Sequence, residues 1–427
     1  MVLYRGLTVP KLLSSLVRAC LLPAVLACML FGYTPSAHAY VWMIRHGETQ
    51  CSNCHADPSG GELLTKYGRA QGNRLLKMNY TRPDSDRAAT QTGQSRPAVS
   101  AARNGFLWGA WDTPDWLLLG GSLRGAAFLQ NSVSVFPMQI DGYAQVKFWR
   151  FRAGGSLGIA QLKQNSPDGR DTFITRNQGD KLNLLSRTHW IALDLGAKRD
   201  WTLRAGRLNL PFGLRVPEHY LWVRDVTRTD RESDQQEGVA LAYNNRWLRS
   251  EVMAIAGNYQ IRPDRYRERG YSAFAEYLIN DGLGIGVSSL VTAAHADRVS
   301  FEQDRTVRGV HGVFMRQRII KPLVVLAEAD LMHISRRDVG YAGFGQLDYE
   351  PIQGLHLITT VEVLDQGLHH PAPVGISYDN VPGAGKPRAG GWVSADWFFY
   401  SQLELRVDGI FRQDSGAYVL AQLHAYL

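Results

Sequence analysis

Apolar and polar residues alternate one by one through most of the chain after Asp115. In one such stretch the apolar face holds Leu403, Leu405, Val407, Gly409 and Phe411, and the polar face holds Gln402, Glu404, Arg406, Asp408 and Arg412. Segments 392–400 and 417–427 repeat the pattern, with Ile410 and Leu420 as the exceptions in the last two strands. A period of two residues predicts β-strands with one apolar and one polar face.

The connections between these segments alternate in length. Counting candidate strands from Asp115 gives about sixteen, an even number as in bacterial outer-membrane barrels. Tight joins occur at 198–200, 244–246, 280–282 and 400–401, and long polar segments at 164–186, 214–235, 258–270, 294–305 and 366–388. Short turns at one end and long loops at the other are typical of such barrels, whereas a soluble sandwich, the alternative, has no reason to keep this order. We therefore predict an all-β, antiparallel outer-membrane β-barrel, in which 334–338 and 413–415 are unusually short outer loops.

Aromatic residues near the predicted strand ends fit the same architecture. Membrane barrels carry girdles of aromatic side chains at both interfaces. The candidates are Trp149, Trp190, Trp201, Trp222, Trp247, Trp397 and Tyr400. Ordinary core packing is the alternative role for each ring.

The N-terminus has the form of an export signal. Three cationic residues accompany the apolar run 19–31, and Ala37-His38-Ala39 is a cleavage site of the A-x-A type. We predict a signal peptide over 1–39, with a retained anchor or lipidation of Cys28 as alternatives. The mature chain then divides into a segment at 40–80, a Pro/Ser/Thr-rich linker at 81–112 and the barrel at 113–427.

Charge adds little to this organisation. The formal net charge is +8, and it falls to +5 without the three basic residues of the export signal. This mild, interspersed charge gives no indication of nucleic-acid binding. The partner expected from the barrel itself is outer-membrane lipid.

Cys51-Ser52-Asn53-Cys54-His55 carries the clearest chemical signal. C-x-x-C-H is the attachment sequence of one covalently bound haem c, in which both thiols bond to the porphyrin and the histidine is an axial iron ligand. His46 is the predicted sixth ligand and Met78 the second choice. A helix is expected over 62–78.

Other interpretations of the two cysteines have weaker support. A structural zinc site needs further Cys or His ligands at suitable spacing, and a thioredoxin-like pair needs a βαβ setting. A plain Cys51–Cys54 disulfide stays open. The stretch 45–49 (Arg-His-Gly-Glu-Thr) resembles the catalytic motif of histidine phosphatases, but the α/β domain of that family does not follow.

A wider pattern surrounds the haem motif. The run C-x-x-C-H-x-x-P-x-G-G, which includes Pro58, Gly60 and Gly61, and the later Tyr67-Gly68-Arg69 resemble exported bacterial monohaem c-type cytochromes that precede an outer-membrane barrel. The resemblance implies that these turn residues bind close to the porphyrin. Separately, 206–213 (GRLNLPFG) is similar to a strand and loop of phosphate-selective-type porins, which implies barrel type and not phosphate selectivity.

These features predict a non-enzymatic electron-transfer component. An even number of strands places both termini, and the haem segment, on the periplasmic side of the bacterial outer membrane. There the haem would serve as a relay or docking point for periplasmic or barrel-lodged cytochromes. The alternative is a porin for small solutes with a structural or sensory haem, and the third possibility is a peroxidase-like enzyme.

Overall fold

The structure is a computed structural model that describes residues 40–78, 105–161, 173–175, 177, 182–259, 264–297, 303–368 and 385–427. The predicted signal peptide and most of the predicted linker lie outside the described residues. The helical elements are η1 (Val41–His46), α2 (Cys51–Cys54), α3 (Lys66–Leu75), α5 (Trp222–Thr227) and η4 (Asp264–Tyr266). The strands are β1 (Leu117–Leu129), β2 (Val133–Phe148), β3 (Phe151–Gln161), β4 (Leu182–Leu185), β5 (His189–Leu195), β6 (Trp201–Leu208), β7 (Gln236–Asn244), β8 (Leu248–Gly257), β9 (Arg269–Asn280), β10 (Leu283–Ala294), β11 (Thr306–Ile320), β12 (Leu323–Ile334), β13 (Gly340–Ile352), β14 (Leu355–Asp365), β15 (Arg388–Tyr400), β16 (Leu403–Arg412) and β17 (Gly416–Tyr426).

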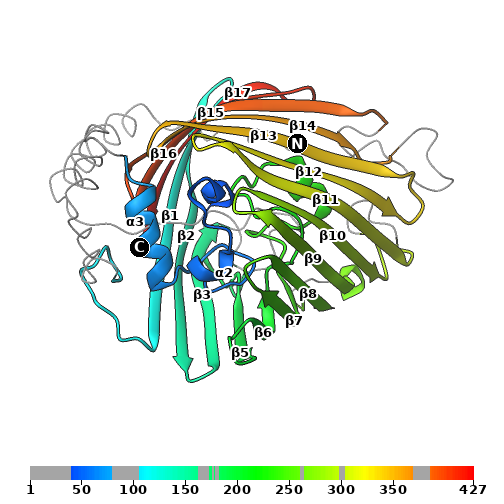
Figure 1. Ribbon diagram of the computed structural model, residues 1–427. Helices are drawn as coiled ribbons and strands as arrows, with labels where there is room; N and C mark the ends of the chain where they lie inside the picture. The colour runs from blue at the N-terminus through cyan, green and yellow to red at the C-terminus, as the bar shows by residue number, and fades with distance from the viewer. Residues whose placement is uncertain are drawn as a thin grey trace.

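The strands form one closed antiparallel barrel (Figure 1). Each strand pairs with its neighbours in sequence, and β1 closes the ring by pairing with both β2 and β17. β4 and β5 both pair with β3, so they occupy one position in the wall and the barrel has 16 strand positions. The predicted fold class is confirmed for the barrel.

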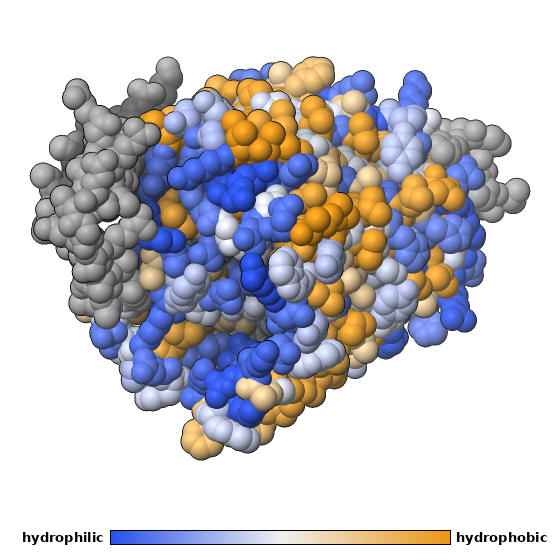
Figure 2. Space-filling model, in the orientation of Figure 1, coloured by the Kyte–Doolittle hydropathy of each residue, from blue (hydrophilic) through white to orange (hydrophobic). Residues whose placement is uncertain are grey.

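The alternating pattern separates the two faces of the wall. In β16 the side chains of Glu404, Arg406 and Asp408 are buried inside the barrel, while Val407 and Phe411 are exposed outside. Figure 2 shows apolar residues spread over the outward faces of the strands and polar residues gathered at the end facing the viewer. The outer surface therefore suits contact with lipid.

The two exceptions in the pattern have a structural reason. Ile410 and Leu420 face the interior and belong to the apolar cluster that packs there. This part of the lumen is filled with protein, and an apolar side chain pointing inward therefore gains packing contacts.

The two ends of the barrel differ as predicted. The connections at 149–150, 245–247, 281–282, 321–322, 353–354 and 401–402 are short, and all lie at the end that holds the C-terminus, where Gly121 N–H donates to the Leu427 carbonyl at 3.1 Å. The strand ends that flank the longer connections 209–235, 258–268 and 366–387 lie at the other end. The two unusually short loops, at 335–339 and 413–415, are also there.

The aromatic prediction is partly right. Trp149, Trp201, Trp247, Trp397 and Tyr400 are exposed, and each lies at or beside a short turn. They form a girdle at the end of the barrel that holds the C-terminus.

Trp190 and Trp222 are corrections to that prediction, since their side chains are buried inside the barrel. Trp190 falls on the inward position of β5, and Trp222 lies on α5 in the long connection 209–235.

Two segments occupy the lumen, as Figure 1 shows for the blue N-terminal residues and the green connection after β6. We call residues 40–78 the N-terminal plug and residues 209–235 the inner loop. Carboxylates of the wall hold the inner loop: Leu214 N–H donates to Glu328 at 2.7 Å and Trp222 N–H donates to Glu362 at 2.9 Å. Among the residues described, no helix has the length and apolar character needed to cross a membrane.

Candidate functional site

The N-terminal plug is fixed to the barrel wall through η1. The guanidinium of Arg45 lies 2.8 Å from Asp348 and 3.1 Å from Glu350, and all three side chains are almost completely buried. The ring of Trp42 packs at 4.1 Å from that of His356. Paired, buried charges of this kind fix the position of η1 on β13 and β14, because any other position would leave charges without partners.

The cysteine motif forms a tight turn that leads into a short hairpin. Cys51–Cys54 is one helical turn, and His55 follows it in an extended conformation, with an antiparallel bridge to Leu64. Thr65 N–H then donates to the Cys54 carbonyl at 2.9 Å. The thiol of Cys54 is buried, and this burial raises its pKa to about 12.

The helix after this hairpin is shorter than predicted. It begins at Lys66, not Glu62, because residues 62–65 are used in the hairpin and Thr65 caps the helix by accepting a hydrogen bond from Gly68 N–H at 3.0 Å. Gly68 lies directly against the backbone of Cys54: a Cβ there would be 2.2 Å from the Cys54 carbonyl oxygen. The glycine of Tyr67-Gly68-Arg69 thus allows α3 to pack against the cysteine turn.

Arg69 connects this unit to the wall. Its buried guanidinium donates to the Leu119 carbonyl on β1. Burial lowers the pKa of Arg69 to about 10.

Pro58, Gly60 and Gly61 form a turn beside the first cysteine. Gly60 N–H donates to the Asp57 carbonyl at 3.0 Å, and both glycines have φ values near the left-handed region, at 96° and 97°. A side chain at either position would be strained. A Cβ at Gly60 would also lie 3.2 Å from Cβ of Cys51, so the turn approaches the cysteine closely.

A small cavity of about 40 Å³ adjoins this turn, and we call it the cysteine cavity. It is lined by Tyr40, Val41, Cys51, His55, Gly60, Gly61, Glu62, Arg215, Pro217, Arg231 and Tyr426. This volume is far below the roughly 300–1,000 Å³ typical of cofactor sites, so a porphyrin could enter only if the segments around the cavity moved apart.

The side chains around the cysteine cavity are of the chemical types that hold a c-type haem. Cys51 and His55, the first thiol and the axial ligand predicted from the sequence, lie on the same cavity wall. The guanidinium groups of Arg215 and Arg231 lie on that cavity too, and such groups pair well with carboxylates like the propionates of haem. Cys54 is buried in the same turn beneath them.

The two candidates for the sixth ligand lie elsewhere in the structure. His46 Nε2 is 3.7 Å from Glu350, and burial lowers the pKa of His46 to about 4, which keeps its imidazole neutral. Met78 Sδ accepts a hydrogen bond from Trp397 Nε1 at 3.0 Å. Neither side chain lines the cysteine cavity.

Asp57 ties the plug to the wall and to the inner loop. Its Oδ1 lies 3.1 Å from Arg204 of β6 and accepts from Ser59, and its Oδ2 accepts from Asn209 Nδ2 at 3.3 Å. Burial alone would raise the pKa of Asp57, but Arg204, Arg215 and the bonds from Ser59 outweigh it and hold the pKa at about 2. Asp57 is therefore a permanent anion within the barrel.

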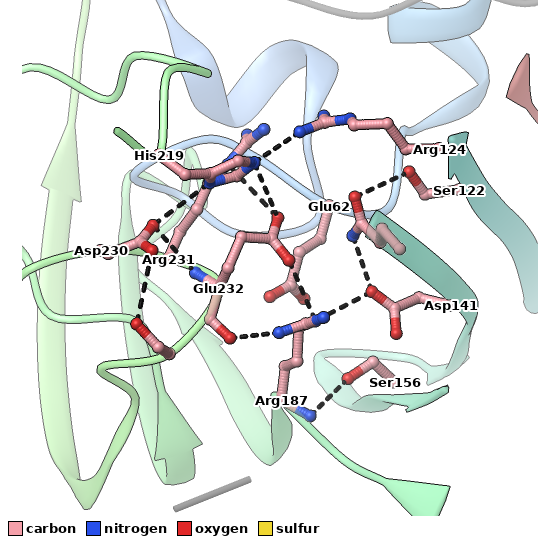
Figure 3. Close-up of polar contacts among 12 residues, drawn as sticks. Glu62, Ser122, Arg124, Asp141, Ser156, Arg187, His219, Asp230, Arg231 and Glu232 are labelled. Atoms are coloured by element: carbon pink, nitrogen blue, oxygen red, sulfur yellow. Dashed lines mark hydrogen bonds and ion pairs between the residues drawn. The ribbon is translucent and has the colours of Figure 1, made fainter. Parts of the chain in front are cut away.

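Glu62 lies close by in a different environment. It accepts hydrogen bonds from Thr188 at 2.6 Å and Asn209 at 3.1 Å. Burial, with a further contribution from the charge of Asp57, raises its pKa to about 7. Glu62 also lines a second cavity, of about 30 Å³, and Figure 3 shows Glu62 among the polar side chains of this region.

Sequence reasoning missed several charged residues of this site, namely Asp57, Glu62, Arg204, Arg215 and Arg231. Two signals pointed toward them. Asp57 and Glu62 lie within and directly after the cysteine motif, and the segment 214–235 is unusually rich in charge for a loop. What the sequence did not show is that this loop folds into the lumen.

Comparison with protein-family models and with curated proteins found no match. Among solved structures, the chain is similar to OmpT, an outer membrane protein of Vibrio cholerae, with a TM-score of 0.52 and 10% identity over 74% of this chain and 99% of that chain. A loop L8 deletion mutant of OmpT gives a TM-score of 0.52 and 9% identity over 73% of this chain and 99% of that chain. The outer membrane channel DcaP of Acinetobacter baumannii gives 0.49 and 11% identity over 73% and 97%. The likeness to OmpT shows the fold, an outer-membrane-type β-barrel.

Proposed function

We propose that this protein is an outer-membrane barrel that carries one covalently bound haem c inside its periplasmic mouth and takes part in electron transfer. One observation supports this most strongly: Cys51 and His55 share a cavity with two arginine side chains, at the end of the barrel that holds the C-terminus. Cys51 and Cys54 would hold the haem covalently, and His55 would be its proximal axial ligand. Bound in this way, the haem supplies a one-electron redox centre.

The residues around the haem would determine how closely the backbone approaches it and which charges surround it. Gly60 and Gly61 allow close approach of the backbone, and Arg215 and Arg231 offer positive charge at the cavity wall. Neighbouring cations favour the form of a redox group with the additional electron, because that form is more negative.

The barrel places limits on the electron path. The apolar band of such a barrel is about 25 Å tall, and one haem at one end does not conduct across it. We therefore propose that the haem is a relay or docking point for periplasmic or barrel-lodged cytochromes. The exposed apolar strand faces and the aromatic girdle support a location in the bacterial outer membrane, with the haem on the periplasmic side.

A second candidate function is passage of small solutes through the barrel. Its supporting observation is the fold itself, since the wall presents charged residues inward, as Arg316 on Glu276 and Arg406 on Asp408 illustrate. In that case the N-terminal plug would have to leave or rearrange to widen the path, and the haem would be structural or sensory. A peroxidase-like reaction would instead need an open sixth position at the iron.

Spectroscopy and conductance separate these functions. We expect purified mature protein to show the visible spectrum of covalent haem, and single Cys51→Ala and His55→Ala variants to lose or alter it. His46→Ala and Met78→Ala test the sixth position: a change from a low-spin to a high-spin spectrum in one variant identifies that residue as the ligand. Planar-bilayer conductance of the same preparations tests the porin alternative, and a haem-free but conducting protein would favour it.

A further inference from the structure

The second cavity lies next to the cysteine cavity and shares three of its lining residues, Glu62, Arg231 and Tyr426. Its remaining lining comes from the barrel wall and the inner loop: Ser122, Arg124, Gln139, Tyr143, Arg187, Glu232 and His424. Figure 3 shows these charged side chains converging from opposite sides of the lumen.

Arg124 is an unusual cation in this cavity. It is only 6% exposed, and its guanidinium faces two imidazoles. Its Nε and Nη2 lie 3.3 and 3.2 Å from His424 Nδ1, and its Nη1 contacts His219 Nε2. Within the described part of the chain, no carboxylate lies within ion-pair distance of Arg124. The carboxylates that interact with its charge, Glu232 and Glu404, therefore do so only at longer range.

Arg187 shows the contrasting arrangement. Its Nε lies 2.9 Å from Asp141 and 3.0 Å from Glu232, and it is fully paired. Glu232 uses Oε2 for this pair, and its Oε1 lies 3.8 Å from both Arg231 Nε and His219 Nε2.

Arg215 lines the cysteine cavity together with Arg231, and the charge of Asp57 acts on it without a direct ion pair. Its Nη2 donates to the Ser59 hydroxyl at 2.6 Å and to the Leu210 carbonyl at 3.2 Å. Three guanidinium groups thus line two adjoining cavities, and among the described residues none of the three has a carboxylate oxygen closer than 3.8 Å. Charges taken from water without a partner are costly, and an anionic ligand would offset that cost.

We propose that Arg124, Arg215 and Arg231 form an internal binding site for carboxylate groups. Guanidinium groups bind carboxylates through paired, charge-assisted hydrogen bonds, and the Ser122 hydroxyl and the Tyr143 phenol add further polar contacts. Glu62 and Glu232 on the same walls disfavour ligand groups of higher negative charge, such as phosphate dianions.

Two sources of carboxylate have this chemistry. One is the propionate pair of the haem, and this source rests on the proposed function. The other is a free small organic acid that enters the barrel, and this source does not depend on the haem. The site itself is common to both.

Calorimetric titration with succinate, in detergent, tests the site. The proteins are the intact protein and its Cys51→Ala/Cys54→Ala variant, each with and without Arg124→Met. Arg246→Met is the matched control, because Arg246 is exposed at a short turn and lies 4.0 Å from Asp281. We expect the Cys51→Ala/Cys54→Ala variant to bind succinate, Arg124→Met to weaken binding about 10-fold or more, and Arg246→Met to leave it unchanged.

The comparison of backgrounds identifies the source. Binding only without the cysteines indicates that propionates fill the site, whereas equal binding in both backgrounds indicates a free acid. If the intact protein carries no haem but binds succinate, the result supports the binding site and overturns the proposed haem function. No binding in either background, or binding insensitive to Arg124→Met, would overturn the site.

The Cys51→Ala/Cys54→Ala variant could fail to fold, and a second measurement therefore uses only the protein with both cysteines. If propionates occupy the site in the intact protein, Arg124→Met lowers the reduction potential of the haem, since it removes a nearby positive charge, and Arg246→Met does not. An unchanged potential, together with no succinate binding by the intact protein, would overturn the proposal.

Discussion

Asn209 Nδ2 lies 3.3 Å from Asp57 Oδ2 and 3.1 Å from Glu62 Oε1. Asn209 belongs to the porin-like stretch 206–213, and Asp57 and Glu62 belong to the stretch that begins with the cysteine motif. The two most recognisable motifs of the sequence, about 150 residues apart, therefore meet inside the barrel. The wall and the N-terminal plug form one polar network.

Arg204 is the central cation of that network, and Arg204→Met should loosen the plug. Arg204 pairs with both Asp57 and Glu251, and all three side chains are buried. Loss of one partner of a buried ion pair costs about 3–5 kcal/mol, because it leaves the other charge without compensation. We expect hydrogen exchange in residues 51–65 to become roughly 100-fold faster or more.

Arg246→Met serves as the control for this substitution. It removes an exposed arginine from the same barrel, and an exposed ion pair contributes about 0–1 kcal/mol to the free energy of unfolding. Unchanged exchange in the Arg204→Met protein would show that the plug is held by other contacts.

Gly68→Ala should separate α3 from the cysteine turn. The new methyl group would lie 2.2 Å from the Cys54 carbonyl oxygen, and such overpacking costs about 1–3 kcal/mol. We expect faster proteolysis of the plug and a lower yield of attached haem. Gly125→Ala is the matched control, since a Cβ at Gly125 meets no atom within 4 Å. Equal behaviour of the two variants would contradict the proposed role of Gly68.

The plug should lose stability between about pH 4.5 and pH 7 because of Glu62. Its pKa in the folded protein is about 7, above the ordinary value of 4.5, and so the folded state binds the proton more tightly than the unfolded state. The contribution of Glu62 is fully present below pH 4.5 and is lost as the pH rises through 7. The protection factors for hydrogen exchange in the plug, which correct for the intrinsic pH dependence of exchange, should therefore be lower at pH 8 than at pH 5, and Glu62→Gln should remove much of the difference.

Asp57 provides the opposite dependence as an internal check. Its pKa is about 2, below the ordinary value of 3.8, so its contribution is present above pH 3.8 and is lost as the pH falls through 2. A plug that is equally protected at pH 5 and pH 8 in the native protein would contradict the account of Glu62.

Much of the barrel was predictable from the sequence. Strands such as β15, β16 and β17 alternate, apart from Ile410 and Leu420, because one face meets the interior and the other faces outward. The alternation of short and long connections predicted the barrel, because outer-membrane barrels have short turns at one end and long loops at the other. Strand β4 was missed, because Leu182–Leu185 lies within 164–186, which the sequence analysis assigned to a long polar loop.

The interior was harder to predict. Trp190 and Trp222 sit inside because the plug and the inner loop fill the lumen, and no local pattern shows what a barrel encloses. The start of α3 at Lys66 depends on the hairpin between His55 and Leu64, which is a tertiary contact. The cysteine motif indicated its chemistry, but its charged neighbours come from distant strands and loops.

The most direct test of the account is the intact mass and visible spectrum of the mature protein, produced in cells that attach haem to C-x-x-C-H sequences. The account predicts a mass increased by that of one haem, a sharp α-band on reduction, and loss of both in the Cys51→Ala/Cys54→Ala variant. A folded barrel with unmodified cysteines and no haem absorbance would contradict it.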